Sequence, residues 1–103
     1  MLMSTAESLP GRTYEVLGLA RGTVVRAKHI GQNIMANFRA LGGGEILEYT
    51  QLLNEARNIA TARMMTEAQN MGANAIIAVR YSTCSVMDGA SEVMAYGTAI
   101  KIN

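Results

Sequence analysis

Apolar and small residues recur at steps of three and four between Glu45 and Met71, which is the spacing of one face of a helix. The stripe is made of Tyr49, Leu53, Ala56, Ala60, Met64, Ala68 and Met71. This pattern predicts one long amphipathic helix. Gly72 stands where a residue in the left-handed conformation would end it. Because several positions of the stripe are alanine, we expect the helix to approach a sheet closely.

Three other segments have the composition or the alternation of β-strands, namely Thr13 to Ala27, Asn74 to Met87 and Val93 to Ile102. Asp88-Gly89 is a turn signal that joins the last two into a hairpin. In the last strand one face carries small residues, and we expect this face to lie under the helix. Those residues are Val93, Ala95, Gly97 and Ala99.

These elements predict an α+β fold with a βαββ order. A right-handed crossover joins the first two main strands, and the last strand lies between them, giving a three-stranded antiparallel sheet of order 1-3-2 with one long helix on one face. Met1 to Leu9 is expected to be a short edge strand or arm, closed by the Pro10-Gly11 turn. Lys28 to Gly44 is expected to hold a short helix within a connection.

The predicted sheet leaves an apolar face without a cover. One helix covers one side only, so Tyr96, Ile100 and Ile102 would face water on the other. An apolar face of this kind on a small domain is more often a contact between subunits than a solvated surface. The sequence therefore predicts a homo-oligomer.

Length and composition narrow the class of protein. The 103 residues fit a single domain, residues 1–103, and half of them are apolar. The net charge of +1 gives no global signal for nucleic acid or an acidic membrane. No secretory signal and no stretch long enough to cross a bilayer is present, and the cysteine is single, so we expect a cytoplasmic protein.

Several short motifs resemble those of the YbjQ family of small prokaryotic proteins. They are Leu9-Pro10-Gly11, Gly42-Gly43-Gly44-Glu45 leading into Tyr49-Thr50-Gln51-Leu52-Leu53, Gly72-Ala73-Asn74-Ala75-Ile76-Ile77 and Ala95-Tyr96-Gly97-Thr98-Ala99, and they span nearly the whole chain. The resemblance implies a dodecin-like subunit that assembles into a ring, a pentamer, with short extra strands reaching between neighbours. The family carries the label "putative heavy-metal-binding" and no characterised function.

No sequence motif predicts a metal site formed by a single chain. Soft metals take thiolate and imidazole ligands, but Cys84 is the only cysteine and His29 the only histidine. In a ring, Cys84 or His29 from several subunits could converge on the axis, with Asp88 or Met87 nearby. The cofactor expected at such a site is a divalent metal ion. The competing interpretation is that Cys84 is a small strand residue and His29 a loop residue.

A basic segment gives a second candidate site. No acidic residue occurs between Val16 and Gly44, whereas Arg26, Lys28 and His29 fall within it. These three residues form a candidate patch for a small anionic ligand. Nucleic acid is not favoured, because aromatic residues for base stacking are nearly absent there. Gly42-Gly43-Gly44 does not complete a P-loop, because the following Lys-Ser/Thr is missing.

No nucleophile, base and orienting group come together in the sequence, so a non-enzymatic function is favoured. The sequence predicts a homo-oligomeric ring that binds a metal or a small ligand at junctions between subunits. The alternative is a structural or adaptor module that binds a partner protein through its repeated face.

Overall fold

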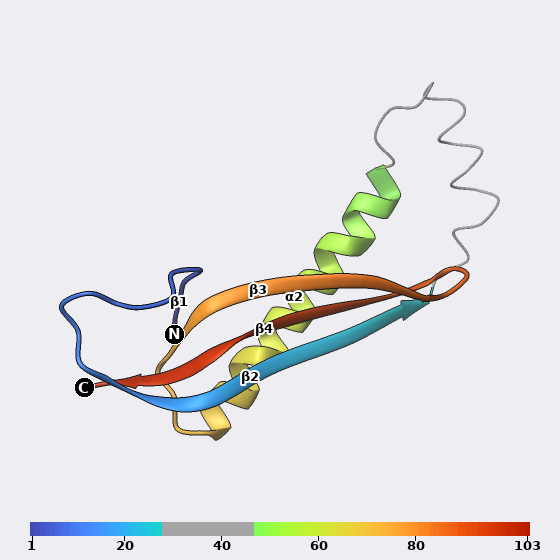
Figure 1. Ribbon diagram of the computed structural model, residues 1–103. Coiled ribbons are helices and arrows are strands. Elements are labelled where there is room, and N and C mark those ends of the chain that lie inside the picture. Colours follow the sequence, from blue (N-terminus) through green and yellow to red (C-terminus); the bar gives the residue numbers. More distant parts are fainter. Residues whose placement is uncertain (28–46) are drawn as a thin grey trace.

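The computed structural model describes residues 1–27 and 47–103, and the described part consists of one helix and four strands (Figure 1). In chain order these are β1 (Leu2–Met3), β2 (Tyr14–Ala27), α2 (Leu47–Asn70), β3 (Ala75–Met87) and β4 (Ala90–Ile102). The α+β class and the long helix are confirmed. The predicted helix within Lys28 to Gly44 lies outside the described residues.

The sheet has four strands in the order β1-β3-β4-β2, where three were predicted. The additional strand is β1, which pairs parallel with β3 so that Leu2 lies beside Ala75 and Met3 beside Ile76. The other neighbours pair antiparallel. A strand of two residues is too short to show an alternation, so the sequence indicated an edge strand or arm there but not its place in the sheet.

The main core lies between α2 and one face of the sheet (Figure 1). Met64 and three alanines of α2 are fully buried, as is Ala95 below them. The contact is closest at Gly22 of β2, where a Cβ atom would overlap the backbone of Ala60 and Met64. The prediction that the small-residue face of β4 lies under the helix is confirmed, because Val93, Ala95 and Ala99 belong to this core. Gly72, with a φ of +90°, ends the helix as expected.

The opposite face of the sheet, here called the helix-free face, has a smaller core at one end. Ile100 and Ala75 are fully buried there, Ile77 is buried beside them, and Leu9 of the N-terminal segment packs against this cluster. The prediction that Ile100 faces water is therefore wrong, and Ile102 is partly covered as well. The reason is that residues 1–13 fold back over this end of the sheet, which strand alternation alone does not show.

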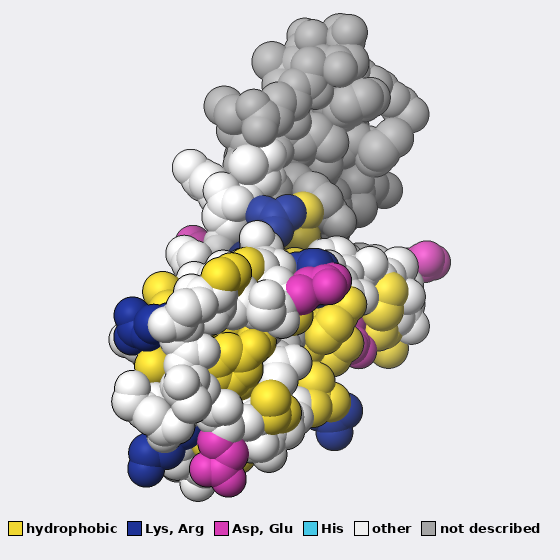
Figure 2. All heavy atoms as spheres, turned by 60° about the vertical axis from the view of Figure 1, so that its left-hand side comes forward, with side chains coloured by type: hydrophobic (Ala, Val, Ile, Leu, Met, Phe, Trp, Pro, Cys, Tyr) yellow, Lys and Arg dark blue, Asp and Glu magenta, His cyan; other side chains and the backbone are white. Residues whose placement is uncertain are grey.

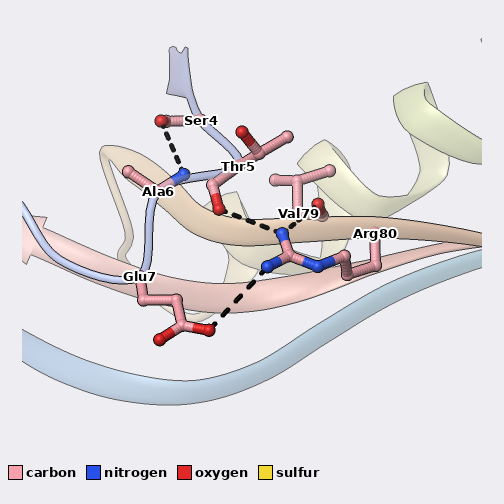
Figure 3. A network of polar contacts seen from close by, with 6 residues as sticks. All are labelled: Ser4, Thr5, Ala6, Glu7, Val79 and Arg80. Carbon is pink, nitrogen blue, oxygen red and sulfur yellow. Dashed lines mark hydrogen bonds and ion pairs between the residues drawn. The ribbon is translucent and has the colours of Figure 1, made fainter.

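Arg80 fastens the N-terminal segment to the edge of β3 (Figure 3). Its guanidinium Nη1 donates to the backbone oxygen of Thr5 at 3.0 Å, and its Nη2 lies 3.9 Å from the Glu7 carboxylate. The backbone N–H groups of Ala78 and Val79 donate to the oxygens of Ala6 and Ser4. Ala78 adopts a φ of +54° where the register shifts between Ile77 and Arg80. This irregularity turns the β3 backbone toward the N-terminal segment.

Candidate functional site

Cys84 lies in the outer half of β3, and its side chain is exposed. Its direct neighbour across the sheet is Glu92 of β4, which in turn lies beside Val25 of β2. Directly opposite residues of antiparallel strands project to the same face. On β4 Glu92 is next to Val93, and on β2 Val25 is next to Val24, and both of these valines pack beneath α2. Because neighbouring residues of a strand project to opposite faces, Cys84, Glu92 and Val25 form one row on the helix-free face.

The row combines two kinds of metal ligand. A thiolate and a carboxylate on directly opposed strand positions have Cβ atoms about 5 Å apart, which is within reach of one ion. Met94 occupies the next position of β4 on the same face and adds a thioether. Among the residues that the structure describes, no three His, Cys, Asp or Glu side chains gather closely enough to hold an ion. A closed site of four ligands would therefore need groups from outside this part of one chain.

Glu92 is a residue that the sequence analysis missed. A regular hairpin around Asp88-Gly89 would set Cys84 opposite Val93. The register shift between Ser85 and Met87 instead moves Cys84 opposite Glu92. No sequence signal marks this shift, because neither glycine nor proline stands at it. Met87 and Asp88, which the metal hypothesis placed near Cys84, are exposed at the end of the same hairpin.

Arg26 does not lie with Cys84. It is directly opposite Ser91, which is opposite Ser85, and this row projects to the side of the sheet that α2 covers. Its guanidinium Nε is buried and has no hydrogen-bond partner among the residues that the structure describes. The two predicted site residues that the structure describes are thus on opposite faces. Lys28 and His29 lie outside the described residues, so the anion patch and a metal ligand at His29 stay predictions.

The surroundings of Cys84 are open. All residues from Arg80 to Met87 are exposed, so the outer half of β3 is uncovered on both of its faces. The only side-chain link from this half to the helix, within the described part, is the 2.8 Å hydrogen bond between the hydroxyls of Tyr81 and Thr61. A cavity of about 380 Å³ lies elsewhere, on α2 beside Ile59 and Arg63. Cys84 is consequently accessible to a metal ion or to another chain.

Within the described ranges, α2 is not apolar enough to serve as a membrane-spanning helix.

Comparison with known proteins places the whole chain in one group. The family model YbjQ_1, described as "Putative heavy-metal-binding", matches residues 1–103. A UPF0145 protein of Thermotoga maritima is 52% identical over 103 residues, covering 99% of this chain and 97% of that protein. A UPF0145 protein of Dehalococcoides mccartyi is 56% identical over 101 residues, covering 97% of each chain.

A solved structure shares the fold. It is a protein of unknown function from Pediococcus pentosaceus that belongs to the DUF74 family. The two chains superpose with a TM-score of 0.66, covering 100% of this chain and 98% of the other, at 19% sequence identity. At this identity the likeness concerns the fold alone.

Proposed function

This chain belongs to the YbjQ_1 family, and from that membership we propose that it forms a homo-oligomeric ring that binds a metal ion at the junctions between its subunits. The ring is a pentamer of dodecin-like subunits, as the family resemblance implies. The bound ion is a soft or borderline divalent metal. Cys84 supplies the thiolate ligand, and Glu92 supplies a carboxylate beside it.

The observation that carries the metal assignment is the pairing of the exposed Cys84 with the partly buried Glu92 on the helix-free face. Zinc and cadmium combine thiolate and carboxylate ligands, and a stable site usually has four of them. One chain offers two of these ligands in the described row. A second subunit that faces this row would complete the set, which is why the proposal places the ion at a junction.

The experiment is native mass spectrometry of the untagged protein together with equilibrium dialysis against zinc, cadmium and copper. We expect a ring that retains metal, and an affinity at least tenfold lower in both Cys84→Ser and Glu92→Gln. Ser82→Ala is the matched control, because Ser82 is exposed on the same strand and the same face but supplies no strong metal ligand.

Equal metal uptake by the wild type and by Cys84→Ser would remove Cys84 from the site and with it the proposed mechanism of binding. A ring that takes up none of the three metals would favour the adaptor function instead, in which the repeated face binds a partner protein. A monomer at micromolar concentration would contradict the ring itself.

A further inference from the structure

The middle of the helix-free face carries two arginines, one on each side of a tyrosine. Tyr96 of β4 lies directly opposite Arg21 of β2 and directly opposite Arg80 of β3. All three project to the helix-free face, because Ala20 and Val79, the strand neighbours of the arginines, pack beneath α2. Neighbouring strands lie about 4.8 Å apart, so about 10 Å separates the two arginine Cα atoms. Arg21, Tyr96 and Arg80 are here called the arginine row.

Two irregularities of the sheet set both arginines on this face. The pairing with β4 shifts by one residue between Val16 and Gly18 on β2, and again between Ile77 and Arg80 on β3. Because a shift by one residue exchanges the two faces, regular strands would turn both arginines toward α2 instead. Bulges of this kind often redirect a side chain beside a functional site.

The backbone of β3 is strained at its irregularity. Ala78 has a φ of +54°, in the left-handed region that disfavours residues with a Cβ atom, and the other positive φ values among the described residues belong to glycines. Strained residues of this kind persist where the surrounding structure holds them, and they gather at ligand sites. Ala78 precedes Arg80 by two positions, so the strain accompanies the placement of this arginine.

The chain itself orients Arg80, and a carboxylate already lies beside it (Figure 3). Its Nη1 donates to the backbone oxygens of Thr5 at 3.0 Å and of Val79 at 2.9 Å, so the guanidinium is held before any ligand binds. Its Nη2 lies 3.9 Å from the Glu7 carboxylate, which is longer than a hydrogen bond, and the Glu7 side chain is 85% exposed. The Glu7 carboxylate thus shows where an anionic oxygen is attracted, and it is held loosely enough for another anion to replace it.

Arg21 and Tyr96 make no polar side-chain contact within the described part of the chain. Neither the guanidinium nor the hydroxyl has a hydrogen bond or an ion pair there, and Arg21 is exposed. The two flanking rows on this face run across β4 from Leu19 to Ile77 and from Thr23 to Ser82, and they contain no acidic residue. Glu92 is four residues from Tyr96 along β4, about 13 Å away. The donors of the arginine row are therefore available to an anion.

The positive charge of the arginine row is a local feature. The whole chain has a net charge of only +1. On the face seen in Figure 2, basic and acidic side chains are interspersed with hydrophobic ones between them, so no broad basic surface forms there. Nucleic acids bind to broad basic surfaces, whereas two guanidiniums on strands about 10 Å apart suit a small anion.

We propose that the arginine row binds a phosphate group as a dianion. The site goes beyond the proposed metal function and is built by one chain. Arg80 donates to the phosphate through the Nη2 that now faces Glu7. Arg21 donates from the opposite side, and the Tyr96 hydroxyl donates between them. A tetrahedral phosphate has oxygens on both sides and accepts from both arginines, whereas one guanidinium already satisfies a carboxylate.

The test is isothermal titration calorimetry of the whole protein with inorganic phosphate at constant ionic strength and about pH 8, where phosphate is a dianion. Arg21→Gln should weaken binding about tenfold, because it removes charge-assisted hydrogen bonds. Tyr96→Phe should weaken binding about threefold, because it removes one neutral donor. Glu7→Gln should instead strengthen binding about threefold, because the competing carboxylate is gone.

Lys101→Gln is the matched control. It removes one positive charge, as Arg21→Gln does, but Lys101 directly follows Ile100 of the helix-free face and therefore projects to the other side. Its phosphate affinity should equal that of the wild type. Arg21→Lys keeps the charge without the planar fork of donors and should bind with intermediate affinity. An unchanged circular dichroism spectrum shows that each variant is folded.

Glycerol 3-phosphate distinguishes the two sources of a phosphate group. Tighter binding than that of inorganic phosphate identifies a phosphomonoester as the ligand, and equal or weaker binding identifies free phosphate. Equal affinity of the wild type and Arg21→Gln, an equal loss in Lys101→Gln, or no binding at millimolar phosphate would overturn the proposal. The result is separable from the metal site, because Cys84→Ser should bind phosphate as the wild type does.

Discussion

The middle of β2, where α2 packs on it, and the outer half of β3 belong to the same sheet but are opposite in burial. At Gly22 the helix backbone lies so close to the strand that a single Cβ atom does not fit. From Arg80 onward, β3 is exposed on both faces. The difference indicates that the first region stabilises the fold of the single chain. The second region is available for binding, and it carries Cys84, which lies directly opposite Glu92 of β4.

The largest effect should come from a substitution that separates α2 from β2. Gly22→Ala places a Cβ atom against the backbone of Ala60 and Met64, which cannot move aside as a flexible side chain can. Overpacking of this kind costs about 2 to 3 kcal/mol. The measurement is urea unfolding at a fixed protein concentration, because association adds to the apparent stability.

Ser82→Ala in the exposed half of β3 is the matched control and should change the free energy of unfolding by less than about 0.5 kcal/mol. If Gly22→Ala were as mild as this control, the close packing of α2 on β2 would not be what stabilises the chain, and the comparison between the two regions would fail.

A smaller effect is expected where the N-terminal segment meets β3, at the boundary of the two regions. Arg80→Ala removes the hydrogen bond to the Thr5 oxygen and the exposed ion pair with Glu7. We expect a loss of about 1 kcal/mol, most of it from the hydrogen bond, because exposed ion pairs contribute little. Hydrogen exchange should become faster at the amides of Ala78 and Val79, which donate to this segment.

The corresponding control is Glu7→Gln, which removes only the ion pair and should leave that exchange almost unchanged. Unaltered exchange in Arg80→Ala would mean that the backbone hydrogen bonds hold the segment without the guanidinium.

The smallest effect concerns the side-chain hydrogen bond that links Tyr81, in the outer half of β3, to α2. Tyr81→Phe removes the hydroxyl that lies 2.8 Å from Thr61. Since both residues are partly solvated, the loss should be about 0.5 kcal/mol. Tyr96→Phe is the control, because among the described residues nothing hydrogen-bonds the Tyr96 hydroxyl. A loss above about 1.5 kcal/mol would show that this half of β3 is fastened to the helix more firmly than its exposure indicates.

The candidate site was predictable only in part. Cys84 could be named because it is the only cysteine, and its place in a strand followed from the alternation after Asn74. Its neighbour Glu92 could not, because one register shift in the hairpin changes which residues are opposed. Charge alone groups Arg26 with Lys28 and His29 in the candidate anion patch. Its side chain projects to the face that α2 covers, because Arg26 is two residues after Val24 on β2 and alternate residues of a strand share a face.

The sequence by itself determined the long helix, the three long strands, the turn at Asp88-Gly89 and the small-residue face beneath the helix. Periodicity and turn residues are local properties, so they can be read from the chain directly. Only the tertiary structure decided that β1 joins the sheet, that Leu9 covers Ile100, and that Cys84 meets Glu92. Each of these depends on contacts between segments far apart in the chain or on a single shift of register. Neither leaves a repeating pattern in the amino-acid sequence.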